Sequence, residues 1–300
     1  MREYTDIDIS GKGTVSGGRC GTLSISGAGK VEGSLVCESA EISGAGTVSG
    51  DLTVSEGFCC DGSGKVEGSF CARSVEVDGA LRVERDFSAE TVEVSGALKV
   101  EGSFHAASLE VDGSCKTARD AEITEKLEID GAFRTEGRLT TGELEVDGTC
   151  AAAKGVSART IHVEGVLKAE ADVQTETLYA DGALKIDGLL NAETAEIWLK
   201  GDSYIESIGG GRVQVRRSTN RFELTIAGIS LQGLFGNKKK NCHLAADVIE
   251  ADEIELECTG ARIVRGVNVH IGPDCEIERV EYSGTLTTDA NTTVREKVKI

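Results

Sequence analysis

Cysteine and histidine are the residue types in this chain of 300 residues that could hold a metal ion or carry redox or nucleophilic chemistry. Zinc and redox sites use closely spaced pairs such as CxxC, whereas the only near neighbours among the ten cysteines are Cys59 and Cys60. Adjacent residues of a β-strand point to opposite faces, so we expect these two thiols to lie apart. The histidines are scattered, at His105, His162, His243 and His270. The sequence therefore predicts no metal site, no cofactor and no catalytic residues.

Charge and motifs exclude further classes of function. Lys and Arg number 32 against 51 Asp and Glu, and the resulting net charge of −19 repels the phosphate backbone of nucleic acids. The sequence also lacks the G-x-S-x-G, H-E-x-x-H and P-loop patterns. We therefore expect neither a nucleic-acid partner nor a small-molecule substrate.

A repeat of 17 or 18 residues runs through the first two thirds of the chain, marked by Asp, Ser or Glu followed by Gly. Between these dipeptides apolar and polar residues alternate in short bursts, which predicts strands and not helices. Abundant glycine and few aromatic residues are typical of repeat proteins. The repeated glycines are Gly27, Gly44, Gly62, Gly79, Gly96, Gly113, Gly131, Gly148, Gly165 and Gly182.

One repeat, TVEVSGALKVEGSFHAAS at residues 91–108, divides into three apolar bursts. Three short strands per coil of 17 or 18 residues predict an all-β fold, a right-handed parallel β-helix of triangular section. Aligning the coils places cysteines in inward columns otherwise filled by Val, Leu and Phe, so we expect reduced, structural thiols. The clearest cases are Cys60, Cys115 and Cys150.

The remaining repeated positions have structural interpretations. We expect the repeated glycines at tight corners, where glycine permits a positive φ. Outward positions should form lines of like charge, such as the basic line through Lys65, Arg82 and Lys99 and the acidic line through Glu93 and Glu110. We favour a solvated wall that keeps the sheets from adhering sideways, and a binding surface is the alternative.

The repeat falters after Trp198 and resumes at about Leu244. We therefore divide the chain into β-helix repeats at 1–204, a basic and apolar insertion or hairpin at 205–243, and further coils with a C-terminal tail at 244–300. Between residues 212 and 240, seven Arg and Lys residues accompany a single Glu and an apolar stretch.

A basic segment with apolar side chains can attach to an anionic membrane surface. The equally open alternative is a hairpin that packs on the coils and neutralises their acidic walls. The candidate membrane residues are Phe222, Leu224, Ile226, Ile229, Leu231, Leu234, Phe235, Lys238, Lys239 and Lys240.

Two parts of the sequence resemble a known family, the bactofilins, which are polymer-forming cytoskeletal proteins. Coils such as VEVSGALKVEGSF carry the resemblance, and IEADEIELECTGARIVRGVNVHIGPDCEIERVEYSGTL resembles the closing segment of the Gram-positive branch. The resemblance implies a right-handed triangular β-helix that forms filaments without nucleotide, often at the membrane, in cell shape, envelope or surface-organelle assembly. The implied partners are copies of the chain itself, anionic membrane, and envelope or organelle proteins.

The residues also favour end-to-end assembly, because an uncapped coil exposes apolar core and unpaired backbone groups. Ile7 and Ile9 fit the first-strand column with little sequence before them, so we expect them to form the polymerisation contact. There is no signal-peptide pattern and no apolar run of about 18 residues, which favours a cytoplasmic protein, peripheral at the inner face of the membrane. A β-helical polysaccharide-active enzyme and a non-polymerising adaptor are the alternatives.

Overall fold

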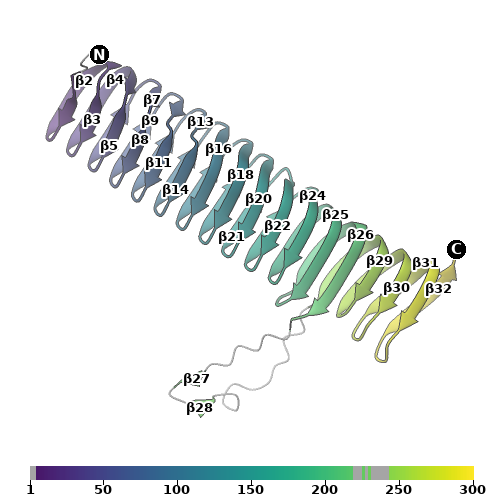
Figure 1. Cartoon of the computed structure of the whole chain (residues 1–300). Helices are drawn as coiled ribbons and strands as arrows, with labels where there is room; N and C mark the ends of the chain where they lie inside the picture. The colour runs from purple at the N-terminus through teal and green to yellow at the C-terminus, as the bar shows by residue number, and fades with distance from the viewer. Residues whose placement is uncertain (1–4, 219–224, 227–228, 231–242) are drawn as a thin grey trace. The chain divides into compact units, whose positions relative to one another are not determined.

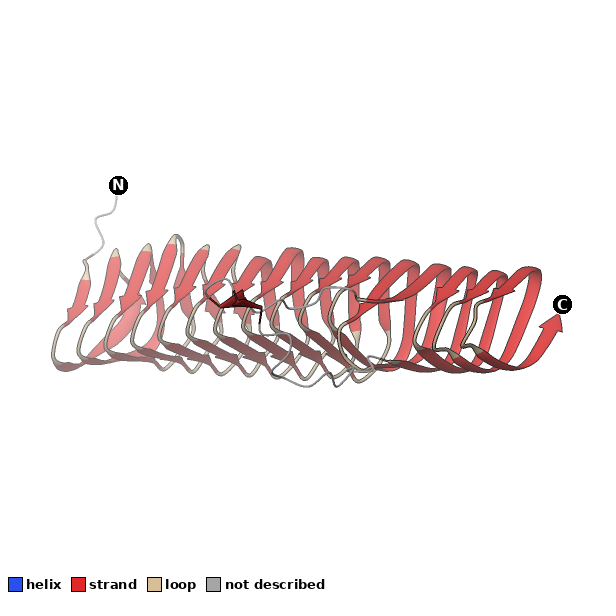
Figure 2. Cartoon of the chain, turned by 90° about the horizontal axis from the view of Figure 1, so that it is seen from below, coloured by secondary structure: helices blue, strands red, loops and turns tan. Residues whose placement is uncertain are grey.

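The computed structural model describes residues 5–218, 225–226, 229–230 and 243–300. By its internal contacts the chain divides into unit 1, Met1–Glu176, and unit 2, Thr177–Ile300. Strands and short connections make up the described residues of both units, which are labelled in Figure 1 and coloured by element type in Figure 2. Both units are parallel β-solenoids, so the predicted all-β, β-helical fold is confirmed.

Each coil of unit 1 has three sides. The first side is formed by β1 Ile7–Ile9, β3 Thr22–Ile25, β5 Ser39–Ile42, β8 Gly57–Cys60, β11 Ser74–Val77 and β14 Thr91–Val94. The second is formed by β2 Lys12–Arg19, β4 Ala28–Cys37, β6 Ala45–Val48, β9 Ser63–Val66, β12 Ala80–Val83, β15 Ala97–Val100, β17 Ser114–Thr117, β19 Ala132–Thr135, β21 Thr149–Ala152 and β23 Val166–Ala169. The third is short, as in β7 Leu52–Val54, β10 Phe70–Cys71 and β13 Phe87–Ser88.

From residue 104 onward, single strands cover the third side and the next first side without a break. The strand pair formed by β16 and β18 turns this corner with a shift of register between Ala106 and Ser108. These strands are β16 Phe104–Val111, β18 Ala121–Ile129, β20 Leu139–Val146, β22 Val156–Val163 and β24 Val173–Ala180, the last of which spans the boundary between the units.

The predicted columns are present in unit 1. Cys60 pairs with Val77 and Val77 with Val94 on the first side, and each of these side chains is fully buried. On the second side, Leu98 pairs with Cys115 and Cys115 with Phe133. Phe70, Phe87 and Phe104 stack in the third column with ring centroids 5.1 and 4.8 Å apart. Continuous apolar columns of this kind form the core of each coil.

The corner glycines are required for a different reason from the one predicted. Among the described glycines, positive φ angles are confined to Gly18, Gly33 and Gly155, outside the repeated column. Instead, a Cβ atom on Gly79 would lie 2.0 Å from the carbonyl oxygen of Gly62, in the preceding coil. Glycine is therefore needed because successive backbones approach closely at this corner, and the prediction of positive φ is wrong.

Unit 2 has longer strands that bend through the corners, namely β25 Ala183–Leu199, β26 Ser203–Arg217, β29 Leu244–Leu256, β30 Thr259–Ile271, β31 Glu276–Thr288 and β32 Thr293–Lys299. Where one long strand ends and the next begins, Cys258, Asp274 and Asn291 turn the chain with positive φ angles of 51°, 59° and 62°. Strand β26 pairs in parallel with β25 and β29, so residues 205–217 belong to the solenoid. The insertion predicted to begin at about 205 therefore begins after Arg217.

Candidate functional site

The first candidate surface is the edge of strand β1, which carries Ile7 and Ile9. In the described part of the chain β1 pairs only with β3, where Ile7 lies opposite Leu23 and Ile9 opposite Ile25. Ile7 is half-buried, whereas Leu23 in the next coil is fully buried. Within the described residues, the first coil thus leaves apolar surface and one edge of its backbone ladder uncovered.

The second candidate is the charged wall of unit 1, on the outer surface of its second side. The Arg82 guanidinium lies 2.9 Å from Glu84 of its own coil and 3.0 Å from Glu101 of the next coil. Lys65 makes the same two contacts one coil earlier, at 3.1 Å to Glu67 and 3.4 Å to Glu84. The hydrogen bond from Arg82 holds the pKa of Glu84 below its ordinary value. The basic line is therefore neutralised by the acidic line beside it.

The first side of unit 1 carries an acidic line with far fewer cations. Glu93, Glu110 and Glu128 lie opposite one another on successive coils. Partial desolvation, followed by the charges of Asp112, Glu128 and Glu93, raises the pKa of Glu110. Like charges at this spacing repel one another, so this surface disfavours contact with another acidic surface.

Cys60, Cys115 and Cys150 lie in the inward columns that the sequence predicted. Cys59 is half-exposed and Cys60 fully buried on opposite faces of β8, and burial raises the pKa of Cys115 and Cys150 to about 12. The structure adds Cys71, which is exposed on the third side. In the part of the chain that the structure describes, no three Cys, His, Asp or Glu side chains are grouped so that they could hold a metal ion.

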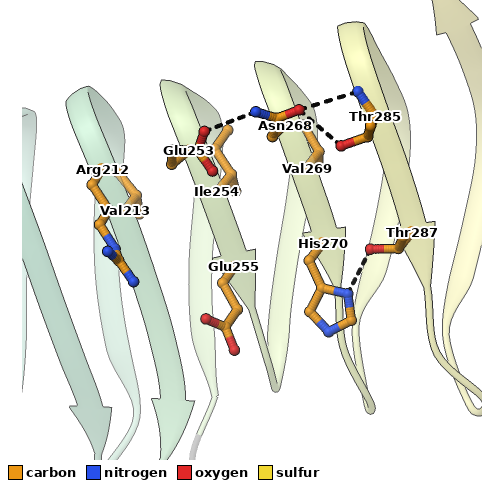
Figure 3. A pocket seen from close by; sticks show the side chains of 10 residues that line it. All are labelled: Arg212, Val213, Glu253, Ile254, Glu255, Asn268, Val269, His270, Thr285 and Thr287. Atoms are coloured by element: carbon orange, nitrogen blue, oxygen red, sulfur yellow. Dashed lines mark hydrogen bonds between the residues drawn. The ribbon is translucent and has the colours of Figure 1, made fainter.

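A polar groove of about 370 Å³ lies on the outer surface of β26, β29, β30 and β31 and was not predicted. Figure 3 shows Asn268 at its centre, donating to Glu253 at 2.8 Å and accepting from the Thr285 hydroxyl at 2.8 Å. Nearby, His270 Nδ1 lies 2.8 Å from the Thr287 hydroxyl. These side chains bond mainly to one another across neighbouring strands, which stabilises the coils.

Glu255, on the same groove, is held as a carboxylate. Partial desolvation alone would raise its pKa, but the hydrogen bond from Gln214 and the guanidinium of Arg216 outweigh this effect and lower it. A carboxylate whose pKa is lowered is a poor proton donor, so Glu255 is not suited to be a general acid at neutral pH.

Three of the basic residues assigned to the insertion lie instead in β26. Arg216 lies 3.2 Å from Glu255 and 5.5 Å from the ring centroid of Trp198, and Arg217 lies 2.7 Å from Asp274. Arg212 lines the polar groove. These three cations belong to a strand of the coils, and neither to the predicted membrane segment nor to the alternative hairpin.

Most of the predicted membrane residues lie outside the described residues, namely Phe222, Leu224, Leu231, Leu234, Phe235, Lys238, Lys239 and Lys240. Ile226 and Ile229 are in β27 Thr225–Ile226 and β28 Ile229–Ser230, which pair antiparallel. None of the described residues belongs to a helix long and apolar enough to cross a membrane.

The fold and these surfaces define a β-solenoid repeat protein. Two curated proteins of Bacillus subtilis (strain 168) resemble part of the chain: the uncharacterized protein YhbE is 41% identical and the uncharacterized protein YhbF 35% identical, each over 114 residues. The match covers 38% of this chain, 44% of YhbE and 42% of YhbF, so the chain spans less than half the length of these relatives. No family model and no solved structure matches the chain.

Proposed function

We propose that this chain is a non-enzymatic cytoskeletal scaffold that assembles end to end into filaments without nucleotide. The observation that carries the proposal is the uncovered edge of the first coil. Val15 of β2 is half-buried, while Val31, its partner one coil further in, is fully buried. Adding a coil from another copy would cover this surface and extend the backbone ladder, a process that needs no cofactor.

The last coil of unit 2 supports the same proposal. Leu286 of β31 and Val294 of β32 are half-buried, whereas their partners one coil further in, Val269 and Ile277, are almost fully buried. Within the described residues, the first and last coils therefore each present apolar surface that a neighbouring copy could cover, although the last coil also carries Lys297 opposite Val280.

The resemblance to the bactofilins and the uncharged core of the coils support a structural role. The side chains that line the groove of Figure 3 bond to one another, which disfavours the alternative of a polysaccharide-active enzyme. In this proposal the filament lies in the cytoplasm and is held at the membrane by the segment that follows Arg217. The homopolymer is the principal partner, and it organises cell shape, envelope or surface-organelle assembly.

The test compares lysine substitutions at neighbouring positions of β1, using electron microscopy of the purified full-length chain without nucleotide. Ile7→Lys and Ile9→Lys would each bury an unpaired charge in the contact, at a cost on the order of several kcal/mol. Both substitutions should therefore shorten or abolish filaments. Asp8→Lys is the matched control, because Asp8 is exposed on the opposite face of the strand. Absence of filaments in the unsubstituted protein, or equal filaments in all variants, would refute end-to-end assembly through β1.

A further inference from the structure

The outer surface of unit 2 carries a line of apolar side chains. Val248 and Ile263 point outward, lie opposite each other on β29 and β30, and are half-buried. Leu189 occupies the same outward line on β25 and is 40% exposed. On the third side of unit 1, outward residues such as Ser88 and His105 are polar and exposed. Apolar outward residues on a sheet face are typical of a contact surface.

A groove of about 510 Å³ runs across this surface, which we call the lateral face. Of the five large apolar side chains that are exposed in the described residues, three line the groove, namely Leu189, Val267 and Ile300. The glycines Gly209, Gly210 and Gly266 leave its floor without side chains. The apolar residues that are exposed elsewhere, Val36 and Tyr204, do not line it.

The charges of the lateral face alternate in sign from one strand to the next. Arg265 of β30 lies 2.9 Å from Glu250 of β29 and 2.7 Å from Glu281 of β31. Glu250 is 57% exposed and Arg265 42% exposed, so both retain surface for a further partner. A guanidinium has five N–H donors, and two carboxylates do not exhaust them.

This arrangement is self-complementary about a two-fold axis that runs along the strands between β29 and β30. Such an axis places Glu250 of one copy opposite Arg265 of the other, twice, and Val248 opposite Ile263, twice. A two-fold contact requires this reciprocity, in which residue i meets residue j and j meets i.

We propose that the lateral face binds the lateral face of a second copy of this chain, in an antiparallel two-fold contact. The occupant is a second copy because the two central strands form reciprocal pairs about this axis, Glu250 with Arg265 and Val248 with Ile263. This contact does not use β1, so it is independent of end-to-end assembly.

The contact should be weak between isolated molecules. With strands about 4.8 Å apart, β25, β26 and β29 to β32 present a surface of about 30 by 13 Å, or about 400 Å² per copy. A stable protein contact buries about 800 Å² per partner. In a filament the contact would recur at every subunit and gain strength through avidity, which would pair filaments side by side.

The decisive test mixes two charge-reversed proteins. In the Ile7→Lys background, which is intended to suppress end contacts, Glu250→Arg and Arg265→Glu are prepared as separate full-length proteins. Sedimentation velocity at increasing concentration should show dimers of the background protein, monomers of each reversed protein alone, and dimers again in their equimolar mixture. If dimers return on mixing, the loss of dimers in each separate protein was not caused by misfolding, because mixing changes the sequence of neither protein.

A pair of matched valines tests the apolar part of the face. Val267 is 40% exposed on the lateral face and Val36 is 37% exposed in unit 1, so each is changed to Asp in the same background. We expect Val267→Asp to weaken dimerisation at least about tenfold and Val36→Asp to leave it unchanged. A monomeric background protein at every concentration, mixtures that stay monomeric, or equal effects of the two valine substitutions would each overturn the lateral contact.

Discussion

Gly79 lies so close to Gly62 of the preceding coil that a Cβ atom on Gly79 would be 2.0 Å from the Gly62 carbonyl oxygen. The same contact recurs between Gly96 and Gly79 at 2.0 Å and between Gly113 and Gly96 at 2.0 Å. The corner column of unit 1 is thus a ladder of backbones that side chains would force apart.

Gly79→Ala should therefore destabilise unit 1 by about 2 kcal/mol, because the backbone must move to admit the methyl group. Gly57→Ala is the matched control, since no atom lies within 4 Å of a Cβ at that position. The control should be neutral or stabilising by about 0.5 kcal/mol, because alanine restricts the unfolded chain. Urea unfolding of both variants measures the difference, and equal midpoints would contradict the close approach.

Cysteine reactivity should follow burial. Cys71 is exposed and should react first with a maleimide in the native protein, whereas Cys115 and Cys150 should react only after unfolding, because burial raises their pKa to about 12. Mass spectrometry of the labelled peptides, with Cys71→Ser as control, identifies the sites. Recovery of few thiols from the unfolded protein, or bound zinc, would contradict the structural role of the cysteines.

Two carboxylates should affect the pH dependence of stability with opposite sign. The pKa of Glu110 is raised in the folded state. Its contribution to stability is therefore fully present below the pKa of the unfolded state, and it is lost as pH rises through the pKa of the folded state. Glu110→Gln should therefore raise the unfolding midpoint at pH 7 and change little at low pH.

The pKa of Glu281 is lowered, first by its hydrogen bond with Arg265, so its stabilisation is present above the unfolded pKa and is lost as pH falls through the folded pKa. Glu281→Gln should lower the unfolding midpoint at pH 7. Thermal unfolding between acidic and neutral pH compares the two variants, and shifts of the same sign at pH 7 would refute the assignment.

Lys297 should limit growth at the last coil. It lies opposite Val280, in a column of buried apolar residues that includes Val264 and Ile249. A charge at such a position discourages further pairing at a sheet edge. Lys297→Val should therefore lengthen filaments at a given protein concentration. Arg295→Val, on the same strand and 75% exposed beside Glu278, should not, and light scattering with electron microscopy compares the two.

Membrane attachment should depend on the cations that follow Arg217. Each basic residue near an anionic leaflet contributes about 1 kcal/mol, so the Lys238, Lys239 and Lys240 to Glu triple variant should lose binding to anionic vesicles in co-sedimentation, as should Leu234→Ser with Phe235→Ser. Binding of the unsubstituted chain should weaken in salt.

The control is Arg216→Gln with Arg217→Gln, because those cations are already paired with Glu255 and Asp274. It should bind vesicles as the unsubstituted chain does. Equal binding by all these proteins, or no binding by the unsubstituted chain, would favour a hairpin that packs on the coils.

The sequence alone determined the repeat, the three sides of each coil and the inward columns of unit 1. It could do so because side chains alternate with a period of two along a strand and the coil length is nearly constant, so residues such as Val77, Val94 and Cys115 fall into register by counting. Burial of Cys60, Cys115 and Cys150 follows from the same register.

Contacts between coils were decided only by the tertiary structure. The approach of Gly79 to Gly62, the bridging of Glu84 by Lys65 and Arg82, and the pairing of Arg217 with Asp274 all join residues whose separation depends on how the corners bend. The lateral face had a signal in the adjacent apolar pairs Val248–Ile249 and Ile263–Val264, where alternation fails. A linear pattern shows that both sides of such a strand are apolar, but only the stacked coils show that the outward members lie together, because neighbouring strands bring residues of different repeats into contact.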